Sequence, residues 1–288
     1  MTSVEVVKLR FSLVSARPST GRRLLLIHGN PSHLGDWASA APLFLEYGDV
    51  LAYDQPGFGQ SADFSDGAHS LERSAETAVA LLDHVGWADP VDVIAHSHGG
   101  LVAMALRALH PRRIRSLVLI ATAGTPAHAT YRVLGLPLLD RLLAWVGPVL
   151  YQSPRLRPLA RFITDLVVRR LFAPAPVSAA LVGQELDALR ERPLRLRTMV
   201  RVAQDSPCRK VAEYATCEGG PALFIHGEHD GVVPKRLAHN LFTLVQEASD
   251  GSRFASLSGG HMIHRCDAEA LRPLLDTWLG RPSPSRLR

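Results

Sequence analysis

The 288-residue chain has little cysteine and no long apolar run, and each scarcity excludes a class of protein. Three cysteines are too few for a disulfide scaffold and are typical of a reducing compartment. No uncharged stretch reaches the roughly 20 apolar residues that span a bilayer. The first residues carry no positive cluster ahead of an apolar run, so a secretory signal is not expected. These absences predict a cytoplasmic protein.

The patterns that hold metals and phosphates are also missing. The cysteines lack the paired spacing of metal ligands, and no glycine-rich phosphate loop occurs. We therefore expect neither a metal nor a cofactor. What is present is the composition of a folded protein, since 47% of the residues are hydrophobic and 20% are charged.

Short apolar runs alternate with helical patterns along most of the chain. Such runs are typical of strands buried on both faces of a parallel sheet. The alternation predicts an α/β fold with a mostly parallel, doubly wound sheet. The expected strands lie at 24–28, 50–54, 91–95, 116–121, 222–226 and 253–257, after one or two strands within 4–16. The expected helices lie at 71–85, 101–109, 237–245 and 268–279.

Residues 125–215 interrupt this alternation with helical patterns alone. Apolar residues recur at helical spacing within 138–146 and again within 159–167. The segment is predicted to be a helical lid inserted into a core formed by residues 1–124 and 216–288. Its leucine-rich faces could pack on the core or line a site for an apolar substrate. The four tryptophans, Trp37, Trp87, Trp145 and Trp278, lie in apolar patterns and are expected to pack.

The positive charge of the chain is concentrated in the same segment. The whole chain has a formal net charge of +5, from 32 basic and 27 acidic residues. Residues 125–215 hold 14 basic and 7 acidic residues, a net of +7, which leaves 18 − 20 = −2 for the rest. This distribution favours solvated amphipathic helices and gives no reason to expect nucleic acid as a partner. The alternative is that the basic lid contacts an anionic substrate or a membrane surface.

The first stretch that carries chemistry surrounds Ser97. The apolar run 91–95 passes directly into a helical pattern through the residues His96, Ser97, His98 and Gly99. A turn this tight needs small residues on either side of its apex, and Ala95 and Gly99 meet that need. The pattern is the small-x-Ser-x-small form of the nucleophile elbow, which lifts the serine hydroxyl clear of the sheet. His96 and His98 could line the site or pack behind it.

Two further stretches follow later strands and supply a carboxylate and a base. Asp230 follows the run 222–226, and His261 follows the run 253–257 after two glycines. A serine–histidine pair needs a carboxylate to fix the imidazole tautomer, and the order Ser97, Asp230, His261 meets that need. Glu228 is a weaker rival to Asp230. His264, one turn beyond His261, is expected to be structural or exposed.

These stretches together resemble the α/β-hydrolase superfamily over nearly the whole chain, with 125–215 similar to its lid. Residues 28–32 (HGNPS) resemble the oxyanion loop of the family, and residues 54–61 (DQPGFGQS) resemble its structural turn. The resemblance implies that the backbone N–H groups of Asn30 and His98 hold the oxyanion. It also implies that Ser97, Asp230 and His261 are the catalytic residues.

The resemblance implies a serine hydrolase that cleaves a carboxylic ester, or a similar small acyl substrate, through an acyl-enzyme. A carbon–carbon bond hydrolase acting on a dienoic ketone is the main alternative, and acyltransferases and cofactor-free haloperoxidases share the same three residues. A non-catalytic binding protein of the same fold is a further alternative. Residues 28–31 also resemble haloalkane dehalogenases, but these and the epoxide hydrolases carry aspartate where Ser97 stands.

Overall fold

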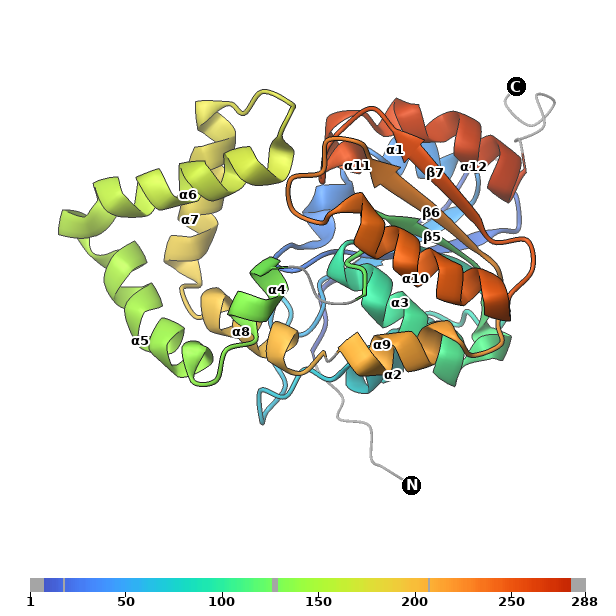
Figure 1. The fold of residues 1–288 in the computed structure, drawn as a ribbon, viewed down its shortest axis with the longest axis horizontal. Coiled ribbons are helices and arrows are strands. Elements are labelled where there is room, and N and C mark those ends of the chain that lie inside the picture. The colour runs from blue at the N-terminus through green and yellow to red at the C-terminus, as the bar shows by residue number, and fades with distance from the viewer. Residues whose placement is uncertain (1–7, 18, 126–128, 207, 281–288) are drawn as a thin grey trace.

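The computed structural model of the chain describes residues 8–17, 19–125, 129–206 and 208–280 (Figure 1). Its centre is a seven-stranded sheet with the strand order β1-β3-β2-β4-β5-β6-β7. Only β1 runs antiparallel to its neighbour, so the predicted α/β class with a mostly parallel sheet is confirmed. The strands are β1 (Phe11–Val14), β2 (Arg23–Ile27), β3 (Asp49–Tyr53), β4 (Val91–His96), β5 (Ile114–Ile120), β6 (Ala222–Gly227) and β7 (Arg253–Leu257).

The predicted strand positions agree with the observed ones to within two residues, except at the N-terminus. There β1 occupies only 11–14 of the expected 4–16, and residues 4–7 lie outside the described part of the chain. Neighbouring side chains of a strand enter different cores: Leu24 and Leu26 pack on one face of the sheet, and Leu25 and Ile27 on the other. The apolar runs are continuous because both faces of the sheet are covered.

Helices cover the two faces of the sheet and form its two cores. On one face pack α1 (Ala41–Leu45), α11 (Ile263–Cys266) and α12 (Arg272–Leu279). On the other face pack α2 (Leu71–His84), α3 (His98–Leu109), α9 (Cys208–Ala215) and α10 (Lys235–Ala248). The segment predicted as one helix at 268–279 is a 3₁₀ turn, Ala268–Leu271, followed by α12.

Five further helices lie beside the sheet, on the left in Figure 1. They are α4 (Ala129–Leu134), α5 (Leu139–Gln152), α6 (Arg157–Phe172), α7 (Ala179–Glu191) and α8 (Arg195–Gln204). The predicted lid also includes α9, whose Val211 and Ala215 belong to the core cluster of the sheet. The start of the predicted lid falls on residues 126–128, which are outside the described part of the chain. The division at 125 and 215 therefore stays a prediction.

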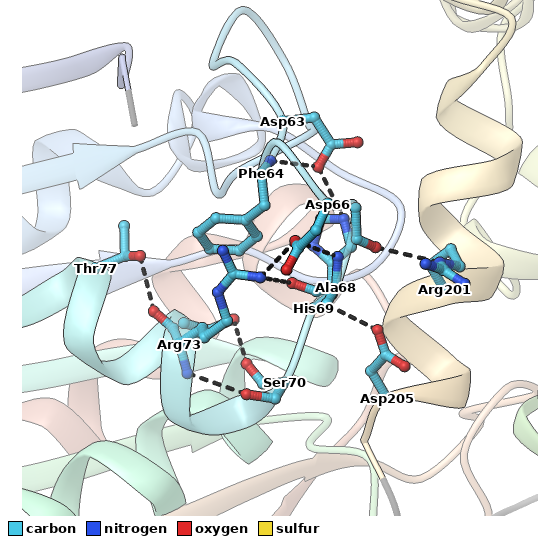
Figure 2. A network of polar contacts seen from close by, with 12 residues as sticks. Asp63, Phe64, Asp66, Ala68, His69, Ser70, Arg73, Thr77, Arg201 and Asp205 are labelled. Atoms are coloured by element: carbon cyan, nitrogen blue, oxygen red, sulfur yellow. Dashed lines mark hydrogen bonds and ion pairs between the residues drawn. The ribbon is translucent and has the colours of Figure 1, made fainter. Parts of the chain in front are cut away.

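A polar network connects α8 to the loop between β3 and α2 (Figure 2). The side chain of Asp205 accepts a hydrogen bond from the backbone N–H of His69 at 2.7 Å. Arg201 donates from Nε to the carbonyl oxygen of Gly67 at 3.2 Å. Asp63 forms a 2.9 Å ion pair with His69, so the loop is itself braced from inside. These contacts hold α8 against the core while α5 and α6 extend beyond it.

One expectation about packing is wrong. Trp37 and Trp87 are buried, and Trp278 packs against the core and donates its indole N–H to Ser116 at 3.2 Å. Trp145, in contrast, lies on α5 with 70% of its surface exposed. The apolar pattern around Trp145 could not tell whether its side chain is covered. Within the described residues, no helix has the length and hydrophobicity needed to cross a bilayer.

Candidate active site

Ser97 occupies the turn between β4 and α3 in a strained backbone conformation. Its φ of 52° and ψ of −119° lie where non-glycine residues are rare, a strain of about 1–3 kcal/mol. Gly99 makes the turn sterically feasible, because a Cβ atom there would lie 2.4 Å from the carbonyl oxygen of Ile27. The requirement for a small residue inferred from the sequence thus has a physical cause, which is the close packing of α3 on β2.

Ser97, His261 and Asp230 lie at the carboxyl ends of β4, β7 and β6 and form a hydrogen-bonded chain. The Oγ atom of Ser97 is 3.1 Å from Nε2 of His261. The other ring nitrogen, Nδ1, is 2.8 Å from Oδ2 of Asp230. With the carboxylate ionised, Nδ1 carries the proton and donates it, which leaves Nε2 to accept from the serine hydroxyl. The arrangement can therefore move a proton from Ser97 to His261.

Both oxygens of the Asp230 carboxylate have hydrogen-bond partners. Oδ1 accepts the backbone N–H groups of Val232 and Val233, both at 2.8 Å, while Oδ2 faces His261. Burial acts to raise the pKa of Asp230, but the hydrogen bond with His261 and the two backbone donors outweigh it and hold the pKa below its usual 3.8. His226 lies on the other side of Asp230 and hydrogen-bonds to the Val233 carbonyl at 3.0 Å. The site therefore keeps its carboxylate charged.

The two rivals of these residues lie elsewhere. Glu228 is exposed. His264 is fully buried, so the expectation that it is structural or exposed holds only in its first part. Its ring stacks 4.3 Å from that of His96 and 4.8 Å from that of Trp37, measured between ring centroids. Neither of its ring nitrogens has a hydrogen-bond partner among the described residues.

Beside the candidate base, the rings of His96 and His264 lie in contact and are tilted by 44° to each other. The ring of His96 lies 4.8 Å from that of His261, and its Nε2 donates to the His261 carbonyl oxygen at 3.0 Å. Burial, reinforced by His261, lowers the pKa of His96 to about 3, and burial likewise keeps the pKa of His264 well below its usual value. Neither ring competes for the proton that His261 would take from Ser97.

The backbone N–H groups of Asn30 and His98 are both unpaired within the described residues. His98 is the first residue of α3, where helix geometry leaves the N–H without an acceptor. Asn30 follows Gly29, whose position packs against the elbow: a Cβ atom there would lie 3.1 Å from Cβ of Ser97. Two N–H groups without an acceptor among the described residues therefore lie in the segments next to Ser97 and are candidates for an oxyanion hole.

The turn at 54–61 supports the loop 28–32, which carries Asn30. The backbone N–H of Gln55 donates to Nε2 of His28 at 2.9 Å, and the Gln55 side chain donates to the His28 carbonyl oxygen at 2.7 Å. The Asp54 carboxylate accepts the backbone N–H groups of Leu34 and Gln60 at 2.7 and 2.8 Å. The turn at 54–61 therefore holds the oxyanion loop in place without reaching the serine.

Residues of the predicted lid contact the candidate site at two points that the sequence did not identify. The Asn30 side chain donates to the Met199 carbonyl oxygen on α8 at 3.0 Å. The Tyr131 hydroxyl on α4 lies 2.5 Å from Nδ1 of His98, whose pKa is lowered to about 3, chiefly by burial. No motif marks Tyr131, because its partner lies 33 residues away and meets it only in the folded chain. Among the described residues, no group of three or more His, Cys, Asp or Glu side chains is arranged to hold a metal.

Residues 22–264 match the alpha/beta hydrolase fold family. The chain belongs to this family. Its matches to characterised proteins include 2-hydroxymuconate semialdehyde hydrolase of Pseudomonas sp. (strain CF600), 26% identical over 87% of this chain and 90% of that protein. They also include pimeloyl-[acyl-carrier protein] methyl ester esterase of Photobacterium profundum, 27% identical over 79% of this chain and 84% of that protein.

A shorter match is to the dihydrolipoyllysine-residue acetyltransferase component of the acetoin cleaving system of Pseudomonas putida. It is 38% identical and covers 36% of this α/β hydrolase and 28% of that protein. Among solved structures, a thermophilic esterase from Thermogutta terrifontis superposes with a TM-score of 0.72 over 96% of this chain and 95% of its own. At 19% identity that likeness shows the fold alone. The resemblance inferred from the motifs is confirmed at the level of the family, and the chain is a hydrolase of the α/β type.

Proposed function

We propose that the chain is a serine hydrolase that cleaves a carboxylic ester, or a similar small and apolar acyl substrate, through a covalent acyl-enzyme. The observation that carries the proposal is the hydrogen-bonded chain from Ser97 through His261 to Asp230, with distances of 3.1 and 2.8 Å. The unpaired N–H groups of Asn30 and His98 beside the serine support it. Acyl transfer requires a nucleophile, a base, a carboxylate and oxyanion donors, and we assign these roles to the five residues.

In the first half-reaction Ser97 is the nucleophile. Nε2 of His261 takes the hydroxyl proton while Oγ forms a bond to the carbonyl carbon, and the carbonyl π electrons move onto its oxygen. The N–H groups of Asn30 and His98 stabilise that oxyanion, an effect worth about 10²–10³ in rate for one donor. The intermediate then expels the alkoxide, which takes the proton from His261 and leaves as the alcohol.

In the second half-reaction water replaces the alcohol. His261 accepts a proton from water as its oxygen attacks the acyl carbon, and the same two N–H groups hold the second oxyanion. Oγ of Ser97 then leaves with the proton from His261, which releases the carboxylic acid and restores the enzyme. Asp230 stabilises the charged imidazole in both halves and does not itself take a proton.

A carbon–carbon bond hydrolase acting on a dienoic ketone is the second candidate. The near full-length similarity to 2-hydroxymuconate semialdehyde hydrolase favours it. The same serine, base and oxyanion donors serve both reactions, and the difference lies in the leaving group, which is a carbon in one case and an oxygen in the other. Geometry at Ser97 therefore does not separate the two candidates.

A serine-directed fluorophosphonate tests the shared part of the proposal. The purified chain should be labelled at Ser97, and a Ser97→Ala variant with an unchanged melting temperature should not. Labelling that persists in Ser97→Ala, or that never occurs in the folded wild type, would show that Ser97 is not an activated nucleophile.

Substrate panels then separate the two candidates. Turnover of p-nitrophenyl esters with rising acyl chain length should be measured beside the loss of absorbance of a dienoic ketone. The ester hydrolase predicts a kcat/KM that is higher for the esters and increases with apolar chain length. A kcat/KM that is higher for the dienoic ketone would assign the enzyme to carbon–carbon bond cleavage instead.

A further inference from the structure

The outward side of α5 carries a stripe of exposed apolar residues. Its inward side is buried through Asp140, Gly147 and Tyr151, which recur at intervals of seven and four. Positions spaced by three, four and seven residues share one side of a helix. The opposite side carries the exposed residues Leu142, Trp145 and Val149, and the exposed Leu138 directly precedes the helix.

The helix α6 repeats this arrangement. Its inward side is buried through Ala160, Thr164, Val168 and Phe172, four residues apart. On the opposite side lie the exposed residues Leu159, Phe162 and Leu166, with Val167 beside them. Helical spacing predicted an apolar face here, and the structure places it against solvent rather than against the core. Each helix thus has one side buried and leaves an apolar side exposed.

Both exposed stripes point away from the rest of the lid. A single buried cluster joins Tyr151 of α5, Ala160 of α6 and Leu186 of α7, with Leu196 of α8 packed against it. The stripes lie opposite the sides that enter such packing, and Figure 1 shows α5 and α6 at the end of the molecule farthest from the sheet. We call the two stripes together the outer lid face.

These side chains differ from the single apolar residues that are scattered over an ordinary protein surface. Trp145 is 70% exposed and Phe162 is 66% exposed, and six smaller apolar side chains share the two stripes with them. Soluble proteins rarely leave large contiguous apolar patches facing water, and such patches mark interaction sites. The outer lid face is therefore a surface that another apolar phase or partner covers.

The charges around the stripes indicate the chemistry of what covers them. Residues 139–172 contain six arginines and two aspartates, a net of 6 − 2 = +4. All six arginines are exposed. Within the described residues only Arg169 forms an ion pair, at 2.6 Å with Asp165, and the other aspartate, Asp140, is buried against Arg201. The arginines are Arg141, Arg155, Arg157, Arg161, Arg169 and Arg170.

On α6 two of these arginines border the stripe directly. Arg169 and Arg170 follow Leu166 by three and four residues, so one lies on each flank of the apolar side. Apolar and aromatic side chains bordered by cations are typical of helices that lie in a lipid interface, with their arginines among anionic headgroups. A second copy of the chain is disfavoured, because it would bring two borders of the same positive sign together.

We propose that the outer lid face docks on the surface of a membrane that contains anionic lipid. Leu138, Leu142, Trp145 and Val149 of α5, with Leu159, Phe162 and Leu166 of α6, enter the interface between headgroups and acyl chains. Arg141, four residues before Trp145, and Arg169 and Arg170 border the stripes and contact lipid phosphates and carboxylates. The helices lie on the membrane and do not cross it. The docking is independent of the reaction at Ser97, so either can be tested without the other.

Liposome co-sedimentation of the full-length chain tests this docking. Wild type should bind vesicles of phosphatidylcholine and phosphatidylglycerol and lose most of that binding on phosphatidylcholine alone or in high salt. Trp145→Ser/Phe162→Ser should weaken binding to the anionic vesicles by at least about tenfold, because two large apolar side chains no longer leave water. The matched control, Val14→Ser/Leu109→Ser, changes two exposed apolar residues outside the predicted lid and should bind like wild type.

A charge series separates the arginines from the apolar stripes. Arg141→Gln/Arg169→Gln/Arg170→Gln should lower binding to anionic vesicles by about 100-fold, since each substitution removes one charge near the headgroups. Neutralising three exposed cations of the core, Arg112→Gln/Lys235→Gln/Arg236→Gln, changes the net charge equally and should have little effect. Equal losses in the two triple variants would mean that net charge alone drives binding, and the outer lid face would not be the docking surface.

Two further outcomes would overturn the proposal. Wild type that leaves anionic vesicles unbound in low salt would do so directly. Sedimentation velocity that finds a dimer, dispersed by Trp145→Ser/Phe162→Ser and without vesicle binding, would assign the same face to a second copy of the chain. An unchanged melting temperature in every variant would show that each is folded, which we expect because all the changed side chains are exposed.

Discussion

Replacement of Asp230 by asparagine should leave the protein folded and nearly abolish turnover, because the surroundings of this residue fix which way the new amide faces. Oδ1 of Asp230 accepts two backbone N–H groups, from Val232 and Val233, at 2.8 Å each. An asparagine keeps those bonds only if its oxygen takes that position. Its NH₂ group then stands where Oδ2 was, 2.8 Å from Nδ1 of His261.

An amide donor in that position reverses the tautomer of His261. Nδ1 becomes the acceptor, the ring proton moves to Nε2, and Nε2 can no longer take the proton of Ser97, which lies 3.1 Å away. In a comparable Ser-His-Asp site the same change lowers kcat by about 10⁴-fold. That factor corresponds to about 5.4 kcal/mol of lost transition-state stabilisation. The substitution is nearly isosteric, so we expect the melting temperature to change little.

The assay measures kcat on the p-nitrophenyl ester with the highest kcat/KM, and thermal unfolding is measured on the same samples. The pKa of Asp230 lies below its usual 3.8, so the wild-type carboxylate stays ionised at every pH above that value and the comparison holds across an ordinary buffer range. Glu228→Gln, which changes an exposed acid two residues away, is the matched control and should behave like wild type. A folded Asp230→Asn variant that retains more than about one-tenth of the wild-type kcat would refute the tautomer argument.

Three further outcomes follow from the same structure. His261→Ala should abolish turnover, whereas His264→Leu should stay within about tenfold of wild-type kcat because no ring nitrogen of His264 has a described partner; the reverse pattern would reassign the base. Gly99→Ala should lower the free energy of unfolding by at least about 1–3 kcal/mol through its 2.4 Å backbone clash, whereas Gly183→Ala, in an open position on α7, should raise it by up to about 1 kcal/mol in urea titrations. Tyr131→Phe should cost about 1–3 kcal/mol in the same titration, since Nδ1 of buried His98 loses its hydrogen-bond partner, and an unchanged midpoint would contradict that.

Most of the sheet and the identity of the candidate site residues could be predicted without coordinates. Strands buried on both faces leave continuous apolar runs, and the run 253–257 predicts β7 to the residue. The candidate site could be predicted for a related reason, because the carboxyl ends of parallel strands meet at one edge of the sheet. Ser97, Asp230 and His261 each follow such a strand, and the structure brings them within hydrogen-bond distance of one another.

Other features depend on contacts between distant segments, which spacing along the chain does not encode. The burial of His264 needs Trp37 and His96 on either side of it. The contact of Tyr131 with His98 needs the lid to be folded over the elbow. The exposure of Trp145 follows from α5 packing by its other side, through Asp140, Gly147 and Tyr151, and the apolar pattern along the chain did not reveal that this side is the covered one.

The sequence by itself determined the family, the order of the strands along the chain and which serine, carboxylate and histidine are candidates, because local patterns set these. Tertiary structure decided the rest: which oxygen of Asp230 faces His261, which N–H groups beside Ser97 stay unpaired, and which sides of α5 and α6 face water. Each of these depends on which segments of the folded chain lie next to the group. A side chain or a donor is free only if no other part of the chain fills the space beside it, and that depends on the whole fold at once.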